Sequence, residues 1–329
     1  MQRDGLSVAL GSAPVSHAVL ARVVRSGFVE SVHHGTAVAI DPDGDVVCAA
    51  GSPQTPIFPR SSNKPLQAVA MLRAGLPLDG HLLALACASH SGERYHLDGV
   101  LRILAGVGLD VSALRNIPAY PLDEDERLVW RAAGRAPSAL AQNCSGKHAA
   151  MLATCVVNGW PTEDYLDAEH PLQRAVSETV ADLAGEPVAA VGVDGCGAPV
   201  HAVSTLGLAV AFARLGAAPP DSPEGRVANA VRAHPEWLGG TSRDVTRLIR
   251  GVPGLVAKDG AEGVYAAGLA DGRAAAVKIA DGGERPRAAV LATLLHRLGV
   301  EAAVLDDLLQ VPVLGHGRPV GRVEVVGLG

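Results

Sequence analysis

Strands are predicted at both ends of this chain and helices between them, and this order constrains the fold more than any other feature. Residues 18–24 alternate around apolar side chains, and an Asp-Pro-Asp-Gly turn separates residues 36–40 from residues 45–49. A turn of this kind between two apolar runs predicts a β-hairpin. Strand patterns return only past Gly254, where they cover residues 263–270, 274–280 and 321–326.

The middle of the chain has mainly helical periodicity. Pro65 suits the first turn of a helix, and apolar residues follow it at helical spacing. Further helices are predicted at residues 81–87, 94–105, 148–157, 172–184, 202–215, 224–233, 242–249, 286–298 and 302–309. The simplest closure of such a chain pairs the N- and C-terminal strands in one antiparallel sheet, with helices packed on it.

We therefore expect an α/β (α+β) fold that forms a single domain over residues 1–329. Its helical middle, about residues 66–250, would be a subdomain inserted between the two groups of strands. A catalytic cleft would lie between the sheet and this insertion, because ligand sites form where such units meet.

Composition and charge exclude several classes of function. Hydrophobic residues make up 48% of the chain and charged residues 19%, so the chain should fold rather than stay disordered. The net charge is −6 and there is no run of Lys or Arg, which argues against nucleic-acid or membrane partners. Residues 1–15 lack the pattern of a signal peptide, and no stretch is apolar enough to span a membrane. We expect a cytoplasmic protein whose five cysteines are reduced.

Lysine is rare in this sequence. Only four of the 28 basic residues are lysines, namely Lys64, Lys147, Lys258 and Lys278. Arginine serves for surface charge but cannot lose its proton, whereas a buried lysine can act as a neutral base or as a ligand. The first three lie within short motifs that could carry chemistry, while chance retention is the alternative for any single one.

Two of these lysines belong to a pattern typical of serine hydrolases. Ser61 and Lys64 are three residues apart at the start of a predicted helix, so the hydroxyl and the amine can meet. A serine that caps an ordinary helix gives the same pattern. Lys258-Asp259-Gly260 precedes a predicted strand pair, as the late Lys-x-Gly triplet of S-x-x-K enzymes does, although Asp-Gly also favours a plain charged turn. A cation there would lower the proton affinity of the Lys64 amine.

The segment Cys87–Glu93 is a cluster of small polar residues that includes Ser89 and His90. Such a loop can supply a second hydroxyl and backbone donors to an oxyanion. It can equally be the end of a helix that stops at Gly92.

Two cysteines and one lysine form a candidate metal site. Cys144 and Lys147 are three residues apart at a predicted helix start, and Cys196 follows in a Val-Asp-Gly-Cys-Gly segment. Two thiolates and a neutral amine could bind zinc and leave a fourth position open. Free buried cysteines are the alternative, because lysine must lose its proton before it can bind a metal.

Taken together, these motifs resemble the Rhizobium etli-type L-asparaginases, the asparaginase II family. The resemblance spans about residues 20–326 and rests on blocks that occur in order: FPRSSNKPLQ (58–67), CASHSGE (87–93), NCSGKH (143–148), GVDGCGAP (192–199) and AKDGAEGVY (257–265). It implies a serine β-lactamase-like fold. It also implies hydrolysis of L-asparagine to L-aspartate and ammonia through an acyl-enzyme, and a homodimer.

The resemblance also implies roles for individual residues. Ser61 would be the nucleophile with Lys64 as its base, and Ser89 and Lys258 would form a second Ser–Lys pair. Cys144, Lys147 and Cys196 match the zinc-binding positions, and Asp194 lies beside them near the substrate. The candidates for contacts with the charged groups of the substrate are Arg60, Asp194 and His90.

One segment departs from the family pattern, and two other functions stay open. We expect Gly283-Glu284-Arg285-Pro286 to lie away from the nucleophile and to affect packing only. A penicillin-binding protein, β-lactamase or other serine amidase shares the S-x-x-K and Lys-x-Gly patterns, but the chain has no S-D-N block or export signal. A non-catalytic protein that binds zinc or a small molecule on the same scaffold would not need both Ser–Lys pairs intact.

Overall fold

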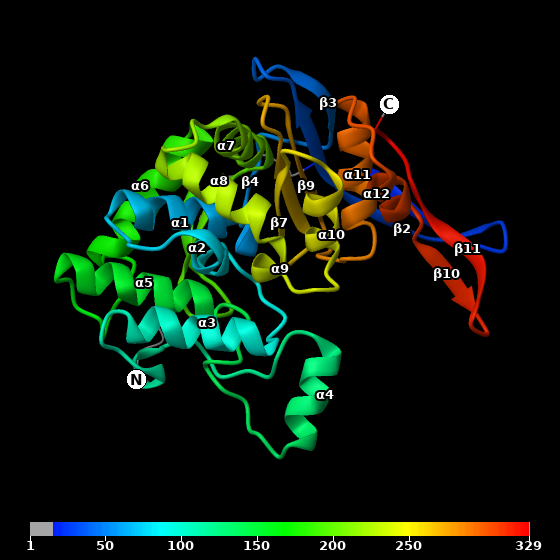
Figure 1. Ribbon diagram of the computed structural model, residues 1–329. Coiled ribbons are helices and arrows are strands. Elements are labelled where there is room, and N and C mark those ends of the chain that lie inside the picture. Colours follow the sequence, from blue (N-terminus) through cyan, green and yellow to red (C-terminus); the bar gives the residue numbers. More distant parts are fainter. Residues whose placement is uncertain (1–15, 329) are drawn as a thin grey trace, which may run out of the picture.

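The computed structural model describes residues 16–328 and is built around an eight-stranded antiparallel sheet (Figure 1). The strand order is β10-β11-β1-β2-β9-β8-β7, with β3 paired to β2. The strands span Ala18–Arg25 (β1), Phe28–Ile40 (β2), Val46–Ala50 (β3), Val256–Gly260 (β7), Val264–Gly268 (β8), Ala274–Ile279 (β9), Pro312–Gly315 (β10) and Arg318–Val325 (β11). Ala21 lies opposite Val325, and Gly35 lies opposite Ile279. The predicted pairing of N- and C-terminal strands in one sheet is confirmed.

The predicted hairpin between β2 and β3 is present, and its turn residues explain why it forms. The Asp41 carboxylate accepts hydrogen bonds from the backbone N–H of Asp43 at 3.0 Å and of Asp45 at 2.9 Å. Gly44 has a φ of +88°, which only glycine adopts without strain. These contacts lie within the turn itself, so the local sequence favours the reversal of the chain without help from distant residues.

Helices cover the sheet and form the rest of the body. They span Lys64–Arg73 (α1), Gly80–Ala86 (α2), Arg94–Ala105 (α3), Glu124–Ala132 (α4), Ser145–Asn158 (α5), Pro171–Ala184 (α6), Thr205–Ala217 (α7), Pro223–Ala233 (α8), Pro235–Leu238 (α9), Asp244–Gly251 (α10), Arg287–Arg297 (α11) and Ala303–Leu309 (α12). Helix α7 packs on β8 and β9, and α11 packs on β2, β8 and β9. Figure 1 shows α1, α2 and α5 to α8 to the left of the sheet and α11 and α12 to its right.

Small residues set the spacing between α7 and the sheet. The chain has few large side chains to fill a wider gap, since aromatic residues make up only 3% of it. A Cβ atom at Gly268 of β8 would lie 1.9 Å from the Phe212 carbonyl oxygen of α7. A Cβ atom at Gly216 would lie 2.4 Å from the Leu269 carbonyl oxygen. Helix α7 therefore approaches the sheet to a distance that only glycine allows, and the core is filled by Ala, Val and Leu.

The middle of the chain is mainly helical, as predicted, but it also contains strands that were not predicted. Three short strands form a second sheet in the order β4-β6-β5, with bounds Pro56–Ile57, Ala190–Val193 and Pro199–Ser204. The helix predicted from residue 202 therefore begins only at Thr205. Ser204 caps it, because its hydroxyl accepts a hydrogen bond from the Gly207 N–H at 2.8 Å. The single domain and the boundary at residues 66–250 stay predictions.

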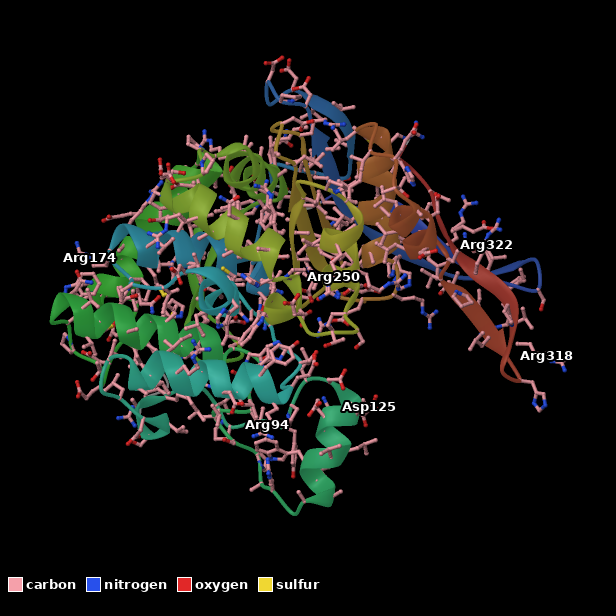
Figure 2. The ribbon with its side chains drawn as sticks, viewed as in Figure 1. Arg94, Asp125, Arg174, Arg250, Arg318 and Arg322 are labelled. Atoms are coloured by element: carbon pink, nitrogen blue, oxygen red, sulfur yellow. The ribbon has the colours of Figure 1, made fainter. Side chains whose placement is uncertain are left out.

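Two exposed parts of the structure project from the body. Helix α4, which was not predicted, buries none of its residues, and an isolated bridge between Ala119 and Ser138 closes the base of its segment. The β10–β11 hairpin extends to the right in the same view, with Arg318 at its tip and Arg322 along it (Figure 2). Within residues 16–328, no helix is both long and apolar enough to cross a bilayer.

Candidate active site

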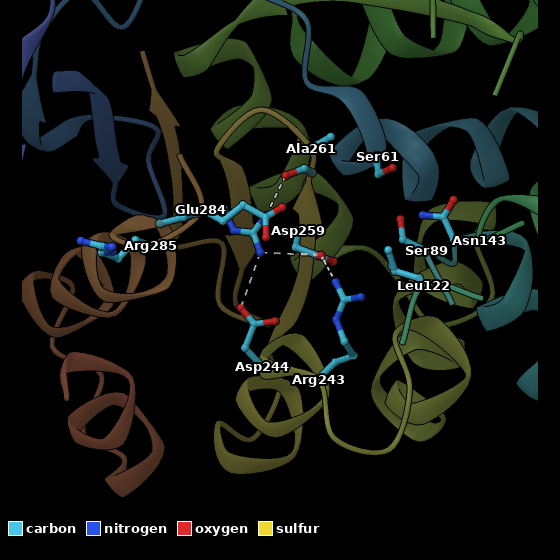
Figure 3. A pocket seen from close by; sticks show the side chains of 12 residues that line it. Ser61, Ser89, Leu122, Asn143, Arg243, Asp244, Asp259, Ala261, Glu284 and Arg285 are labelled. Carbon is cyan, nitrogen blue, oxygen red and sulfur yellow. Dashed lines mark hydrogen bonds and ion pairs between the residues drawn. The ribbon is translucent and has the colours of Figure 1, made fainter. Parts of the chain in front are cut away.

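The two candidate serines open onto one cavity of about 540 Å³. Ser61 and Ser89 lie on the same wall, with Asn143 beside them, and a charged cluster lies across the cavity (Figure 3). The lining residues are Ser61, Ser89, Leu122, Asn143, Arg243, Asp244, Asp259, Gly260, Ala261, Glu284, Arg285 and Arg287. The sequence motifs far apart in the chain are therefore brought together, and the cavity is large enough for an amino acid.

The turn that carries Ser61 is held in an unusual conformation. Arg60, directly before it, has a φ of +54°, a region that residues other than glycine rarely adopt. Strand β7 packs so closely here that a Cβ atom at Gly260 would lie 2.6 Å from the Pro59 carbonyl oxygen. The Ser62 hydroxyl donates to the Lys258 carbonyl oxygen at 2.9 Å. The serine turn and the Lys258 strand are thus fixed to each other.

The Lys64 side chain lies in the first turn of α1 and is 1% exposed. Its amine donates to the Ala88 carbonyl oxygen at 2.5 Å, to the Ser89 hydroxyl at 3.0 Å and to the Cys144 sulfur at 3.1 Å. Among the described residues, Lys64 has no hydrogen bond to Ser61, and Ser89 has none to Lys258. The structure therefore joins Lys64 to Ser89, a contact that the predicted pairs did not include.

The Lys258-Asp259-Gly260 triplet lies within β7 and not in the turn before the strands, so the reading as a plain turn is wrong. The Lys258 amine is fully buried and donates to both the side chain and the backbone oxygen of Asp259. Burial lowers the pKa of Lys258 to about 8, with Lys64 and Arg243 acting in the same direction and Asp259 opposing them. Lys258 can therefore change its charge near neutral pH.

A cluster of charges that sequence reasoning missed surrounds Asp259. Its other carboxylate oxygen lies 2.6 Å from Arg243 and 3.9 Å from Arg287, which also lies 3.8 Å from Asp244 (Figure 3). Although burial opposes ionisation of Asp259, the neighbouring Lys258, Arg243 and Arg287 hold its pKa far below the usual range. No motif marked Arg243 or Arg287, because each is one of several charged residues near the start of a predicted helix, where such residues are common.

One expectation about this region is wrong. Glu284 and Arg285 belong to the segment that was expected to lie away from the nucleophile, yet both line the cavity with Ser61. The segment connects β9 to α11, and Arg287 in the first turn of that helix donates to the Gly260 carbonyl oxygen at 2.8 Å. The departure from the family pattern therefore lies at the site.

None of the three candidates for substrate contacts is among the residues that line the catalytic cavity. Arg60 donates to the Asp194 carboxylate at 2.7 Å, so these two form a pair. Burial opposes ionisation of Asp194, but the charges of Lys147 and Arg60 outweigh it and lower the pKa of Asp194. His90 is fully buried behind Ser89, with Nε2 at 2.8 Å from the Ser145 hydroxyl, and it does not line the cavity. Burial keeps the pKa of His90 well below its usual value, so the ring is neutral.

Cys144, Lys147 and Cys196 converge beside the site, as the metal hypothesis requires. The Lys147 amine donates to the Cys196 sulfur at 3.3 Å. A hydrogen bond with Cys144 and the charge of Lys147 lower the pKa of Cys196 to about 5, although burial opposes this. The same hydrogen bond and burial raise the pKa of Cys144 to about 12. Burial lowers the pKa of Lys147, but the charges of Cys196, Cys144 and Asp194 outweigh it and raise the pKa.

The three residues fit a zinc ion only if the Lys147 nitrogen is one of the ligands. Two buried sulfurs and one nitrogen are donors that zinc accepts, and the lowered pKa of Cys196 favours the thiolate that a metal binds. Within the described residues there is no group of three or more His, Cys, Asp or Glu that could hold a metal ion. Lys147 would have to lose its proton, which zinc promotes by competing for the lone pair.

Comparison with known proteins gives one family and several distant structures. A model of the family described as L-asparaginase II matches residues 21–325. No curated protein matches the chain. A structure titled "Crystal Structure Analysis of Mglu in its tris and glutamate form" is 15% identical with a TM-score of 0.41, and the match covers 86% of this chain and 62% of that one. The chain thus spans less than two thirds of the length of Mglu in that structure.

Two further structures match most of both chains. A beta-lactamase from Mycobacterium bovis is 14% identical with a TM-score of 0.41, and the match covers 84% of this chain and 93% of the other. EstCE1, described as a hydrolase with promiscuous acyltransferase activity, is 12% identical with a TM-score of 0.40, and the match covers 86% and 94%.

Proposed function

Because the chain belongs to the L-asparaginase II family, we propose that it is an amidohydrolase that converts L-asparagine to L-aspartate and ammonia. One observation supports this most strongly. The hydroxyls of Ser61 and Ser89 open onto one cavity, and the buried amine of Lys64 lies behind them in contact with Ser89. Acyl transfer by a hydroxyl nucleophile needs a base within reach, and Lys64 can act on Ser61 through Ser89, the hydroxyl that it contacts.

In the proposed mechanism, Ser61 Oγ attacks the side-chain amide carbon of the substrate and the Lys64 amine takes the hydroxyl proton. We propose that Ser89, whose hydroxyl accepts a hydrogen bond from the same amine, relays this proton. The carbon–nitrogen bond then breaks, and ammonia leaves with a proton delivered from the lysines. A water molecule hydrolyses the Ser61 ester by the reverse proton route, which releases aspartate.

Lys258 has a separate role in this proposal. Its protonated amine would stabilise the charge that develops on the substrate or pass a proton to the leaving ammonia. The ionised Asp259 and the neighbouring arginines set how readily that amine gives up its proton. The charged α-groups of the substrate would contact Arg60 and Asp194, an ion pair 2.7 Å apart that lies beside the catalytic cavity, since Arg60 directly precedes Ser61.

The proposal includes zinc as a bound ion, but no step of the reaction takes place on it. Cys144, Lys147 and Cys196 would hold it, and the ion would supply positive charge beside Asp194. In its absence the Lys147 ammonium supplies that charge. We also propose that the protein is a cytoplasmic homodimer, which light scattering of the purified protein would test.

The test is ammonia release from L-asparagine and L-glutamine, measured side by side for wild type, Ser61→Ala and Ser177→Ala. Ser177 lies on α6 and does not line the catalytic cavity, so it is a matched control. We expect release from L-asparagine that Ser61→Ala abolishes and Ser177→Ala preserves. Release from neither amide by folded, zinc-supplied protein would refute the proposal. Turnover of a β-lactam instead would favour the β-lactamase alternative.

A further inference from the structure

A second cavity, of about 330 Å³, adjoins the catalytic one, and Arg60 is its only lining residue to which the proposed reaction gives a role. It lies between the central sheet, which contributes Thr36 and Lys278, and strand β4 of the small sheet. Pro56, Ile57 and Phe58 form an apolar wall. Its volume suits a molecule of about amino-acid size.

The two cavities share one partition. Ser61 and Ala261 line the catalytic cavity, whereas their neighbours Arg60 and Glu262 line the second one. Both partition residues have left-handed backbones, with φ of +54° and +59°, although neither is glycine. Strained conformations of this kind persist where the surrounding structure enforces them, and they gather at functional sites.

Lys278 is the charge of the second cavity that is available to an anion. Arg60 also lines the cavity, but its guanidinium is paired with Asp194 at 2.7 Å and lies 3.7 Å from Glu262. The Lys278 amine donates to the backbone oxygen of Glu262, which leaves its other hydrogens free to donate to a ligand. Burial lowers the pKa of Lys278 and Arg60 adds to this, while Glu262 and Asp281 oppose it; a bound carboxylate would further stabilise the charged amine.

Lys278 is also the one lysine of four that the proposed reaction does not employ. The other 24 basic residues are arginines, and lysine presents a compact charge at the end of a flexible stem. Such a charge opposite an apolar wall matches a ligand with a carboxylate at one end and an apolar group at the other.

We propose that the second cavity binds a small carboxylate with an apolar group, whose carboxylate contacts Lys278 and whose apolar part contacts Ile57 and Phe58. The site adjoins the catalytic cavity at Arg60, because Arg60 directly precedes Ser61 in the chain and its guanidinium lies 3.7 Å from Glu262 in the same wall. The inference concerns binding and stands apart from the proposed hydrolysis.

The test is calorimetric titration with isocaproate and with its neutral counterpart, isocaproamide. We expect one isocaproate per chain, bound at least about tenfold more tightly than the amide, because a charge-assisted hydrogen bond is lost in the amide. Lys278→Met should weaken isocaproate binding by about tenfold or more, while Lys278→Arg should restore most of it. Arg318→Met, at the tip of the β10–β11 hairpin, should leave it unchanged (Figure 2).

A second arm separates this site from the catalytic one. In the Ser61→Ala protein, saturating L-asparagine should leave the isocaproate stoichiometry unchanged. Displacement of isocaproate by L-asparagine, equal binding of acid and amide, unchanged binding in Lys278→Met, or no binding at millimolar concentration would each overturn the proposal. If Lys278→Met fails to fold, Ile57→Asp carries the same prediction, because it places a negative charge against the ligand.

Discussion

The charge of Lys258 gives the sharpest prediction about the mechanism. Its pKa of about 8 means that the amine loses its proton as pH rises through about 8. If the protonated amine assists the leaving ammonia, kcat should fall above that pH. Asp259 opposes the lowering of this pKa, so its removal should move the decline to lower pH.

The size of this shift follows from the contact between the two groups. Two unit charges about 4 Å apart at an effective dielectric constant of about 20 interact by about 4 kcal/mol, or about 3 pH units. Arg243 and Arg287 already neutralise part of the Asp259 charge, so we expect Asp259→Asn to shift the decline by about 1 to 3 units. Arg243→Gln should shift it the opposite way, because the positive charge of Arg243 lowers the pKa of Lys258.

The assay is kcat for ammonia release across about pH 5 to 10 for wild type, Asp259→Asn, Arg243→Gln and Lys258→Arg. Lys258→Arg should be slower but should lack the decline near pH 8, because arginine stays protonated. Circular dichroism of each variant checks that it is folded. A decline that stays at the same pH in Asp259→Asn, or that persists in Lys258→Arg, would refute the role given to Lys258.

Three further predictions concern packing, substrate binding and metal. Gly146→Ala should lower the free energy of unfolding by about 1–3 kcal/mol, because the added Cβ would lie 2.4 Å from the Leu85 carbonyl oxygen. Urea unfolding measures this, and an unchanged urea midpoint would contradict the contact between α2 and α5. Arg60→Gln should raise KM for L-asparagine about tenfold with a smaller change in kcat, whereas an effect on kcat alone would show that Arg60 does not hold the substrate. Cys196→Ser should lower the zinc content of purified protein in elemental analysis, and equal contents in wild type and variant would contradict the metal site.

Much of the fold could be predicted because local patterns agreed with the final structure. The β2–β3 hairpin follows from its turn residues, and α1 follows from Pro65 and helical spacing. The strand β6 was missed because residues 199–217 form one buried apolar run, and periodicity alone does not separate a buried strand from a helix. Helix α4 was missed because its apolar residues, Leu128 to Trp130, are consecutive and do not show helical spacing. What stabilises its first turn is the Asp123 cap.

The site was predictable only where its residues lie in short motifs. Ser61, Ser89 and Lys258 each belong to one, and their order in the chain pointed to a shared cleft. Arg243 and Arg287 carry no such signal, since their partner Asp259 is 16 and 28 residues away in sequence and the contact exists only once β7, α10 and α11 meet. The contact between Lys64 and Ser89 is likewise a product of tertiary structure.

The most direct test of the proposed mechanism is to find which serine carries the acyl group. L-Asparagine turnover would be quenched in acid, the protein digested, and the peptides analysed by mass spectrometry for wild type, Ser61→Ala and Ser89→Ala. We predict an aspartyl ester on the peptide that contains Ser61, present in wild type and absent in Ser61→Ala. An ester on Ser89 instead, or full turnover by Ser61→Ala, would contradict the assignment of Ser61 as the nucleophile.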